Sequence, residues 1–262
     1  MKELLIMLPG PTNVPKEVLN AMATPMIGHR TQEFHELYEE VVNGAKYVFQ
    51  TKNDVFALTS SGTGGVECAI SNITSPGDEF IVPVMGLFGE RLKRTIEKFG
   101  GKVHSINIEL GKAVTVEDIK RSLEEKPDVV GVALVHNETS TGVRIKDLRE
   151  IAKLCKKNGK LLIVDAVSSL GGDELPVDEW GIDVCVTGSQ KCLACPPGMA
   201  LISISDRAWE KIEKNEGGRS FYFDLLTYRK YFYEKRETPF TPVIPLFHAL
   251  KKALNLIREE GL

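Results

Sequence analysis

The segment Leu161-Leu162-Ile163-Val164-Asp165-Ala166-Val167 is a nearly uninterrupted apolar run with a single carboxylate close to its end. Similar runs, rich in valine and isoleucine, recur at Val55–Thr59, Glu79–Val84, Val103–Ile108, Asp128–Val135, Asp183–Thr187 and Met199–Ser205. Strands buried on both faces of a parallel sheet have such continuous apolar sequences, because helices cover both faces. These runs therefore predict a mainly parallel, seven-stranded sheet.

Amphipathic stretches lie between several of the predicted strands. Leu87–Phe99 places Leu92, Ile96 and Phe99 on one face, and Lys146–Asn158 has an apolar face opposite its lysines and arginine. Alternation of strands and helices requires crossover connections over the sheet. We therefore predict an α/β fold in three layers, with helices on both faces of the sheet.

Both ends of the chain differ from this alternating middle. A Pro- and Gly-rich arm precedes two helical patterns, and three prolines precede a last helical pattern. We predict an N-terminal arm over residues 1–25 and a large α/β domain over residues 26–236. Residues 237–262 are predicted to form a connecting segment with one helix.

The composition excludes several classes of protein. The chain has 262 residues and a formal net charge of −3, whereas nucleic-acid-binding proteins usually show a basic patch or strip. No apolar run approaches the roughly 20 residues that cross a bilayer, and the apolar start is too short for a secretory signal. Five cysteines, an odd number, fit reduced thiols better than a disulfide framework. We therefore expect a cytoplasmic protein that binds neither nucleic acid nor a membrane.

The turn Thr59-Ser60-Ser61-Gly62-Thr63-Gly64-Gly65 follows the first predicted strand and opens a helical pattern. Free backbone N–H groups and the helix dipole converge at such a turn, and the hydroxyls of Ser61 and Thr63 add donors. Taken alone, the motif fits a phosphate site and a well-capped tight turn about equally. It matches neither GxGxxG nor GxxxxGK[ST], so dinucleotide and Walker-type sites receive little support.

Two ionisable residues stand at the ends of other predicted strands. Asp165 ends an apolar run, where a buried carboxylate needs a cationic partner such as a protonated ring nitrogen of a ligand. The alternative interpretation is that Asp165 caps the following turn or lies on the surface. Lys191 follows a strand and a polar turn, where desolvation can lower its pKa and so free its amine to attack a carbonyl. The alternative interpretation is a solvated surface residue, which a lone lysine usually is. The order of phosphate turn, acidic strand end and lysine strand end favours one ligand site at one edge of the sheet.

Short motifs spread over nearly the whole chain share one resemblance: Pro9–Pro15, Gly28–Arg30, Ser61–Gly64, Gly86–Arg91, His136–Gly142, Val164–Gly172 and Gly188–Lys191. Together they resemble the class V aminotransferase family of fold-type I pyridoxal-phosphate (PLP) enzymes, in its alanine–glyoxylate / serine–pyruvate branch. The resemblance implies the fold-type I form of the sheet, pyridoxal 5'-phosphate as the cofactor, and a homodimer.

The resemblance also assigns roles to the residues at the strand ends. Lys191 is implied to form a Schiff base with the cofactor and then to shuttle the substrate α-proton, and Asp165 to keep the pyridine nitrogen protonated. Phe88 is implied to stack on one face of the cofactor ring and Val167 to pack on the other. Thr139 is implied to hydrogen-bond the ring hydroxyl. The implied catalytic residues are thus Lys191 and Asp165.

The cofactor phosphate has its own implied set of contacts. Ser61, Gly62, Thr63 and Gln190 are implied to hold it, so that its binding energy positions the reacting atom. In the family, the partner subunit also contributes to this site from the segment that corresponds to Thr238–Pro242. No single residue of that segment can be chosen from the sequence.

Family members are longer than this chain and end in a small domain that supplies the arginine for the substrate carboxylate. This chain stops at Leu262, so we expect a fragment of a longer product or a truncated form, with that domain mostly absent. Its last helix, near Leu246–Glu260, is expected to find little to pack on within the chain. The apolar face of this helix consists of Leu246, Leu250, Leu254 and Ile257.

We expect an aminotransferase that moves amino groups from alanine or serine to glyoxylate or pyruvate. One alternative is a cysteine desulfurase-like PLP lyase, a type expected to have one histidine on the ring and another before the lysine; Phe88 and Gln190 stand there instead. A second alternative is a truncated homologue without catalysis. Cys192 and Cys195 form a C-x-x-C without a second pair, so we interpret them as packing residues and expect no metal site.

Overall fold

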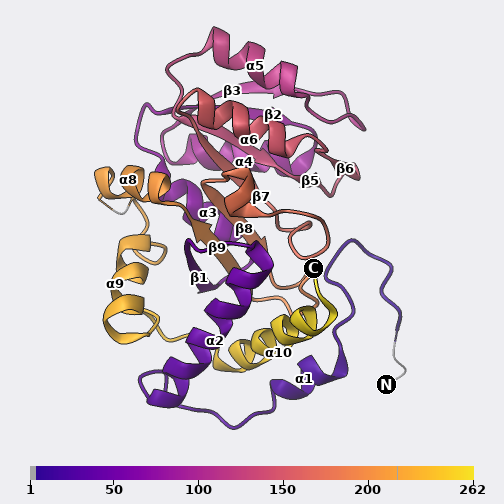
Figure 1. Ribbon diagram of the computed structural model, residues 1–262, viewed down its shortest axis with the longest axis vertical. Helices are drawn as coiled ribbons and strands as arrows, with labels where there is room; N and C mark the ends of the chain where they lie inside the picture. Colours follow the sequence, from indigo (N-terminus) through magenta and orange to yellow (C-terminus); the bar gives the residue numbers. More distant parts are fainter. Residues whose placement is uncertain (1–3, 217) are drawn as a thin grey trace.

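The computed structural model describes residues 4–216 and 218–262, and its centre is a seven-stranded sheet flanked by helices (Figure 1). The strands, in their order across the sheet, are β1 (Asp54–Thr59), β9 (Met199–Ile204), β8 (Val184–Gly188), β7 (Leu161–Asp165), β4 (Gly131–Val135), β2 (Glu79–Val84) and β3 (Lys102–Asn107). Strand β9 is antiparallel to both of its neighbours, and the other pairs are parallel. Each predicted apolar run contributes one strand, so the predicted α/β fold with a mainly parallel sheet is confirmed.

A hydrophobic core covers each face of the sheet, which explains why the strands are apolar throughout. Along β4, Val132 and Leu134 belong to one core, whereas Ala133 and Val135 belong to the other. The first core includes residues of α1 (Lys16–Ala21), α2 (Gln32–Phe49), α5 (Val116–Glu125), α6 (Leu148–Lys157), α7 (Val177–Trp180) and α10 (Ile244–Glu260). The second includes residues of α3 (Gly62–Ile73), α4 (Leu87–Lys98), α8 (Asp206–Lys214) and α9 (Leu225–Lys235). The predicted three-layer arrangement is therefore confirmed.

Helix α10 packs along α2 (Figure 1). Leu250 and Leu254 are 0% and 1% exposed, and the ring centroid of Phe247 lies 5.3 Å from that of Phe34 in α2. Gly44 permits the close approach, because a Cβ atom there would lie 3.0 Å from the Cβ atom of Leu254. The expectation that this helix has little to pack on was wrong. Its partner, α2, is far away in the sequence, so the matching apolar face could not be recognised locally.

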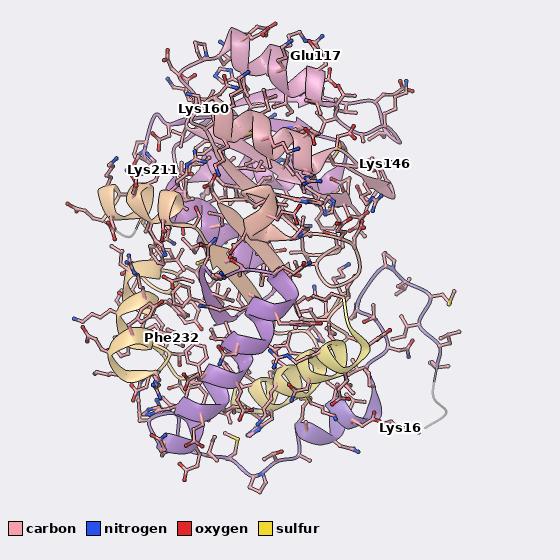
Figure 2. All side chains as sticks on the ribbon, in the orientation of Figure 1. Lys16, Glu117, Lys146, Lys160, Lys211 and Phe232 are labelled. Atoms are coloured by element: carbon pink, nitrogen blue, oxygen red, sulfur yellow. The ribbon has the colours of Figure 1, made fainter. Side chains whose placement is uncertain are left out.

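Phe232 of α9, which is labelled in Figure 2, packs against rings from two other elements. Its ring centroid is 5.2 Å from that of Tyr38 in α2 and 6.2 Å from that of Phe56 in β1. Such edge-on pairs contribute about 0.5–1.5 kcal/mol each beyond the burial of their area. They fix α9 to the end of the sheet where β1 lies. Over the described ranges, no helix has the length and apolar character needed to cross a membrane.

Candidate active site

A cavity of about 190 Å³ lies at the carboxyl ends of the strands, the edge at which open α/β sheets bind ligands. Strands β1, β2, β4, β7 and β8 all lead into segments that line it. Every residue predicted to hold the cofactor lines this cavity: Ser61, Gly62, Thr63, Phe88, Thr139, Asp165, Val167, Gln190 and Lys191. The structure thus brings together side chains from separate parts of the chain, while their individual roles stay predictions.

The turn after β1 places the N-terminus of α3 at the cavity wall. Ser61 is the N-cap residue, and its hydroxyl accepts a hydrogen bond from the Gly64 N–H at 3.3 Å. A Cβ atom at Gly62 would lie 2.8 Å from a methyl group of Val167, so glycine is required for this turn to pack on the segment after β7. The first N–H groups of a helix lack intrahelical acceptors, and they lie at the positive end of its dipole. The turn therefore has the geometry of an anion site.

Asp165 ends β7 beside the cavity. One of its carboxylate oxygens accepts a hydrogen bond from the Val167 N–H at 3.0 Å. Burial raises the pKa of Asp165 to about 6, and that backbone hydrogen bond, with the more distant charges of Arg91 and Lys191, offsets the rise only in part. Direct contact with a ligand cation would favour the charged carboxylate. The group is therefore suited to a cationic ligand atom.

The N-terminal arm lies against Lys191. The Lys191 amine donates a hydrogen bond to the Pro9 carbonyl oxygen at 2.9 Å, and the Thr12 hydroxyl donates to the Lys191 carbonyl oxygen at 3.2 Å. The Thr12 N–H donates to the Gln190 carbonyl oxygen at 3.1 Å. Burial lowers the pKa of Lys191, which favours the neutral amine that attacks a carbonyl. The side-chain oxygen of Gln190 is buried and has no hydrogen-bond partner among the described residues, so this amide can serve a ligand.

Phe88 is held by Glu138, a residue to which the sequence assigned no role. Glu138 is 0% exposed, and its carboxylate accepts hydrogen bonds from the N–H groups of Phe88 at 3.2 Å and Gly89 at 2.9 Å. It thereby caps α4, whose N-cap residue, Gly86, has no side chain to do so. A Cβ atom at Gly86 would lie 2.8 Å from Glu138 Cγ. A carboxylate from the hairpin of β5 (Asn137–Glu138) and β6 (Val143–Arg144) thus fixes the start of α4.

Thr139 belongs to a hydrogen-bonded group of polar residues beside Asp165. Its hydroxyl donates to the Ser168 hydroxyl oxygen at 2.8 Å, and the Ser168 hydroxyl donates to the Asn137 carbonyl oxygen at 3.0 Å. His136 does not line the cavity. It is buried, with one ring nitrogen 3.0 Å from the Ser169 hydroxyl oxygen, and burial lowers its pKa to about 4.

Arg91 lines the same cavity, although no role was predicted for it from the sequence. Its guanidinium carbon lies 4.8 Å from the centre of the Phe88 ring, and the guanidinium donates a hydrogen bond to the Thr63 hydroxyl at 3.0 Å. The signal that could have indicated it is its spacing from Phe88. Residues three apart in a helix share one face, so a cavity-facing Phe88 places Arg91 at the cavity as well.

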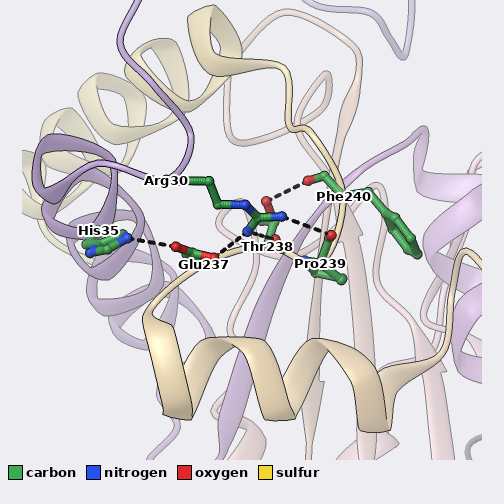
Figure 3. Close-up of polar contacts among 6 residues, drawn as sticks. All are labelled: Arg30, His35, Glu237, Thr238, Pro239 and Phe240. Carbon is green, nitrogen blue, oxygen red and sulfur yellow. Dashed lines mark hydrogen bonds and ion pairs between the residues drawn. The ribbon is translucent and has the colours of Figure 1, made fainter.

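Arg30 ties the segment after α9 to the start of α2 (Figure 3). Its guanidinium contacts the Glu237 carboxylate at 2.5 Å and donates to the carbonyl oxygens of Thr238 at 2.7 Å and Pro239 at 3.1 Å. A ring nitrogen of His35 lies 3.2 Å from the second carboxylate oxygen of Glu237. These contacts hold the chain in place where it enters the segment for which the resemblance implies a phosphate contact.

The end of this segment also contacts Thr59, the last residue of β1. The Val243 N–H donates a hydrogen bond to the Thr59 hydroxyl at 3.3 Å, and the Tyr222 hydroxyl donates to the Thr59 carbonyl oxygen at 3.4 Å. The rings of Tyr222 and Phe240 stack with centroids 5.1 Å apart. Residues 238–243 therefore lie close to the end of β1. The implied contribution of Thr238–Pro242 to a partner subunit stays a prediction.

Comparison with known proteins identifies the family. The model of the aminotransferase class-V family matches residues 7–262. This chain belongs to the class-V aminotransferase family. It is 49% identical to an uncharacterized aminotransferase of Methanocaldococcus jannaschii, over 98% of this chain and 67% of that protein. It is 38% identical to the alanine–glyoxylate aminotransferase of Oryctolagus cuniculus, over 98% of this chain and 67% of that protein.

The crystal structure of an alanine–glyoxylate aminotransferase from Nostoc sp. has the same fold as this class-V chain. The TM-score is 0.96 at 37% identity, and the match covers 100% of this chain and 70% of that one. The chain therefore spans about two thirds of the length of the relatives it matches.

Class-V aminotransferases depend on PLP, and the cavity residues of this member fit that group. Asp165 is a buried carboxyl for which the described residues provide no ion pair, which suits a protonated pyridine nitrogen. The N-terminus of α3 suits a phosphate, and the lowered pKa of Lys191 suits attachment of an aldehyde. The side-chain amide of Gln190 lines the cavity, and its NH2 group is the part of this side chain that can donate to a phosphate.

One sequence-based interpretation in this region needs correction. Cys195 is buried, as a packing residue should be, but Cys192 is exposed and its thiol donates to the Ser168 carbonyl oxygen at 3.5 Å. Cys192 follows Lys191 directly, and the turn there exposes its side chain, which the C-x-x-C spacing did not predict. Across the described part of the chain, no group of three or more His, Cys, Asp or Glu side chains is placed to hold a metal ion.

Proposed function

We propose that this chain binds PLP through Lys191 and transfers amino groups from alanine or serine to glyoxylate or pyruvate. The observation that supports this best is that one cavity contains an amine with a lowered pKa and a buried carboxyl group that forms no ion pair with the residues the structure describes. The first suits an aldehyde and the second suits a protonated ring nitrogen. Perturbed groups that share a cavity are typical of active sites.

When bound, PLP draws electrons away from the α-carbon of the amino acid, which makes the proton there more acidic. Lys191 would hold the aldehyde carbon and, once released, would move the proton at the α-carbon. Asp165 would keep the proton on the pyridine nitrogen. Phe88 and Val167 would enclose the ring and exclude water, and the Thr139 hydroxyl would orient it.

The phosphate would be held by Ser61, Gly62 and Thr63 at the N-terminus of α3, together with the amide of Gln190. Glu138 would act as a positioning residue, because it fixes the backbone of Phe88. The choice of alanine and glyoxylate rests on the relatives from rabbit and Nostoc that carry these substrates in their names.

We also propose that the chain functions as a homodimer. Its N-terminal arm leaves Leu5 and Met7 79% and 83% exposed, and Phe221 is 86% exposed beside Phe240. Apolar side chains grouped in this way favour a protein partner. Sedimentation at micromolar concentration should give a dimer, and a monomer under these conditions would contradict this part of the proposal.

Absorbance titration with PLP tests cofactor binding. The wild type and the control Lys157→Ala, which alters an exposed lysine, should gain the visible band of a lysine-bound cofactor, whereas Lys191→Ala should not. Addition of L-alanine should then remove the band, and glyoxylate should restore it. A band that persists with every amino acid would rule out transamination by this chain while leaving PLP binding intact. The absence of any band would contradict the proposal as a whole.

A further inference from the structure

We propose that Arg91 binds an oxyanion of the ligand in this cavity, either the phosphate of PLP or the carboxylate of the amino acid. This inference rests on the proposed function. The resemblance implies an arginine that binds the substrate carboxylate, and the sequence assigned that role to no residue of this chain. Arg91 is a cationic side chain within it, and it lines the cavity together with Ser61, Thr63 and Lys191.

The position of Arg91 is fixed by two contacts. Its guanidinium lies over the Phe88 ring at 4.8 Å and donates to the Thr63 hydroxyl at 3.0 Å. Thr63 belongs to the first turn of α3, whose N-cap residue is Ser61. The guanidinium therefore stands beside the anion site at the start of α3. A planar guanidinium stacked on an aromatic ring is preorganised, and it has further N–H groups for a second acceptor.

A phosphate bound at the N-terminus of α3 needs a cationic side chain beside it. A bound phosphate carries about −1.5 to −2 charges near neutral pH, whereas a helix N-terminus supplies only about half a positive charge. Among the described residues that line the cavity, Lys191 and Arg91 are the cationic ones. Lys191 would be used in holding the aldehyde, so Arg91 remains to balance the phosphate.

Arg94, on the same helix, shows what an arginine of α4 does when it has no role in the cavity. Both arginines are exposed, and they differ in their partners: Arg94 bonds the Glu90 carboxylate at 2.9 Å. Arg91 instead contacts an uncharged hydroxyl and an aromatic ring, and no ion pair between Arg91 and a carboxylate occurs among the residues that the structure describes. Its positive charge is thus available to a ligand anion.

Binding of PLP and of pyridoxal, which lacks the phosphate, should be compared in the wild type, Arg91→Gln, Arg91→Lys and the control Arg94→Gln. A charge-assisted hydrogen bond lost on substitution lowers affinity roughly ten- to a hundredfold. If the anion is the phosphate, Arg91→Gln should weaken PLP by this factor and leave pyridoxal unchanged. Arg91→Lys should recover part of the loss, and Arg94→Gln should match the wild type. Melting temperatures without ligand check that each variant folds.

The second arm of the experiment identifies a carboxylate. If Arg91→Gln binds PLP normally, the PLP-loaded proteins are titrated with L-alanine and with ethylamine, its analogue without a carboxylate. A loss for alanine alone supports the proposal with the carboxylate as the anion. The proposal would be overturned if the wild type and Arg91→Gln had equal affinities for both PLP and alanine. It would also be overturned if Arg94→Gln lost as much affinity as Arg91→Gln.

The anion site at Arg91 can be tested separately if the protein does not bind PLP at all. If the wild type takes up no PLP, inorganic phosphate and pyruvate are used as probes in thermal-shift measurements. An increase in melting temperature that occurs in the wild type and is lost in Arg91→Gln supports an oxyanion site at Arg91 even then. Identical shifts in the two proteins, or no shift in either, would contradict the inference.

Discussion

The Lys191 amine and the Pro9 carbonyl oxygen lie 2.9 Å apart, so the N-terminal arm holds the candidate cofactor lysine directly. The arm is itself fixed by Thr12, which bonds the backbone of both Gln190 and Lys191. A neutral carbonyl gives the amine a hydrogen-bond acceptor without adding a negative charge that would raise its pKa. The arm therefore forms part of the cavity wall, where Gly10 and Pro11 lie, although it precedes every strand of the sheet in the sequence.

Gly10→Ala should disturb this contact specifically. Gly10 has a φ angle of +141°, and a Cβ atom there would lie 2.5 Å from Lys191 Cδ and 2.6 Å from Lys191 Nζ. The flexible lysine side chain can move away, so the free energy of unfolding should fall mainly by the backbone cost of replacing such a glycine, about 1–3 kcal/mol. The displaced amine should bind PLP at least about tenfold more weakly. Urea denaturation and absorbance titration measure the two effects.

Gly111→Ala is the matched control for this substitution. Gly111 has a φ angle of +88°, with no atom within 4 Å of the position of its Cβ. It should show a similar loss of stability and an unchanged affinity for PLP. If both variants bind PLP equally well, the arm does not position Lys191.

Asp165→Asn should stabilise the protein in the absence of cofactor. The folded pKa of Asp165, about 6, lies above its ordinary value of 3.8 because the group is buried. The folded state therefore binds the proton more tightly, and the wild type loses stability as pH rises from about 4 to 6. The loss reaches about 3 kcal/mol, whereas the neutral amide of the variant has no charge to bury. Above pH 6 the variant should thus be the more stable protein, by up to about this amount.

Urea denaturation at a series of pH values measures the difference between the two proteins. The difference is the useful quantity because His136 also makes the stability of the protein depend on pH. Its pKa is lowered to about 4, so the protein loses stability as pH falls from about 6.5 to 4. That contribution is common to both proteins and cancels. A difference that stays constant from pH 4.5 to 7.5 would show that Asp165 does not titrate in this way.

The sheet and the main site residues could be predicted from the sequence because their signals are local. Seven apolar runs follow from burial on both faces, and the carboxyl ends of parallel strands meet at one edge of the sheet. Asp165 and Lys191 each end or follow such a run, so their shared location needed no knowledge of side-chain contacts. The turn at Ser61 carries its own signal, a polar cap and glycines after a strand.

The residues that the sequence did not reveal act through contacts between distant segments. Glu138 accepts hydrogen bonds from the backbone at Phe88, which leaves no mark in the sequence around either residue. The spacing of Arg91 from Phe88 places it on the same face of α4, but its contact with Thr63, which lies in another helix, could not be predicted from that spacing. The exposure of Cys192 likewise depends on the course of the turn after Lys191.

Glu138→Ala should destabilise the protein by about 3 kcal/mol. It removes the acceptor of the Phe88 and Gly89 N–H groups, and a buried donor without a partner costs about 1–3 kcal/mol. Two N–H groups at the start of α4 lose their acceptor together, which gives the total of about 3 kcal/mol. Glu90→Gln, on the same helix but partly exposed and paired with Arg94, should change stability by less than about 1 kcal/mol. Equal denaturation midpoints for wild type and Glu138→Ala would refute the capping role.

Arg30→Ala should also destabilise the fold, because it leaves Glu237 without its main partner. The Glu237 side chain is 10% exposed, and Arg30 additionally bonds the carbonyl oxygens of Thr238 and Pro239. Arg30 itself is 38% exposed, so solvent weakens the pair, and its removal should cost about 1–3 kcal/mol, between the values for exposed and buried ion pairs. Arg30→Lys keeps the charge but cannot serve all three acceptors, so it should lose about half of this.

The neighbouring ion pair of Arg236 with Glu39 is the control for Arg30. Both of its side chains are well exposed, at 58% and 43%, so Arg236→Gln should change the free energy of unfolding by less than about 1 kcal/mol. Added salt should weaken the Arg236 pair and leave the Arg30 effect nearly unchanged, since burial shields Glu237 from screening. Urea denaturation at low and high salt separates the two cases. A loss in Arg30→Ala that disappears at high salt would show that the contact acts only as a surface ion pair.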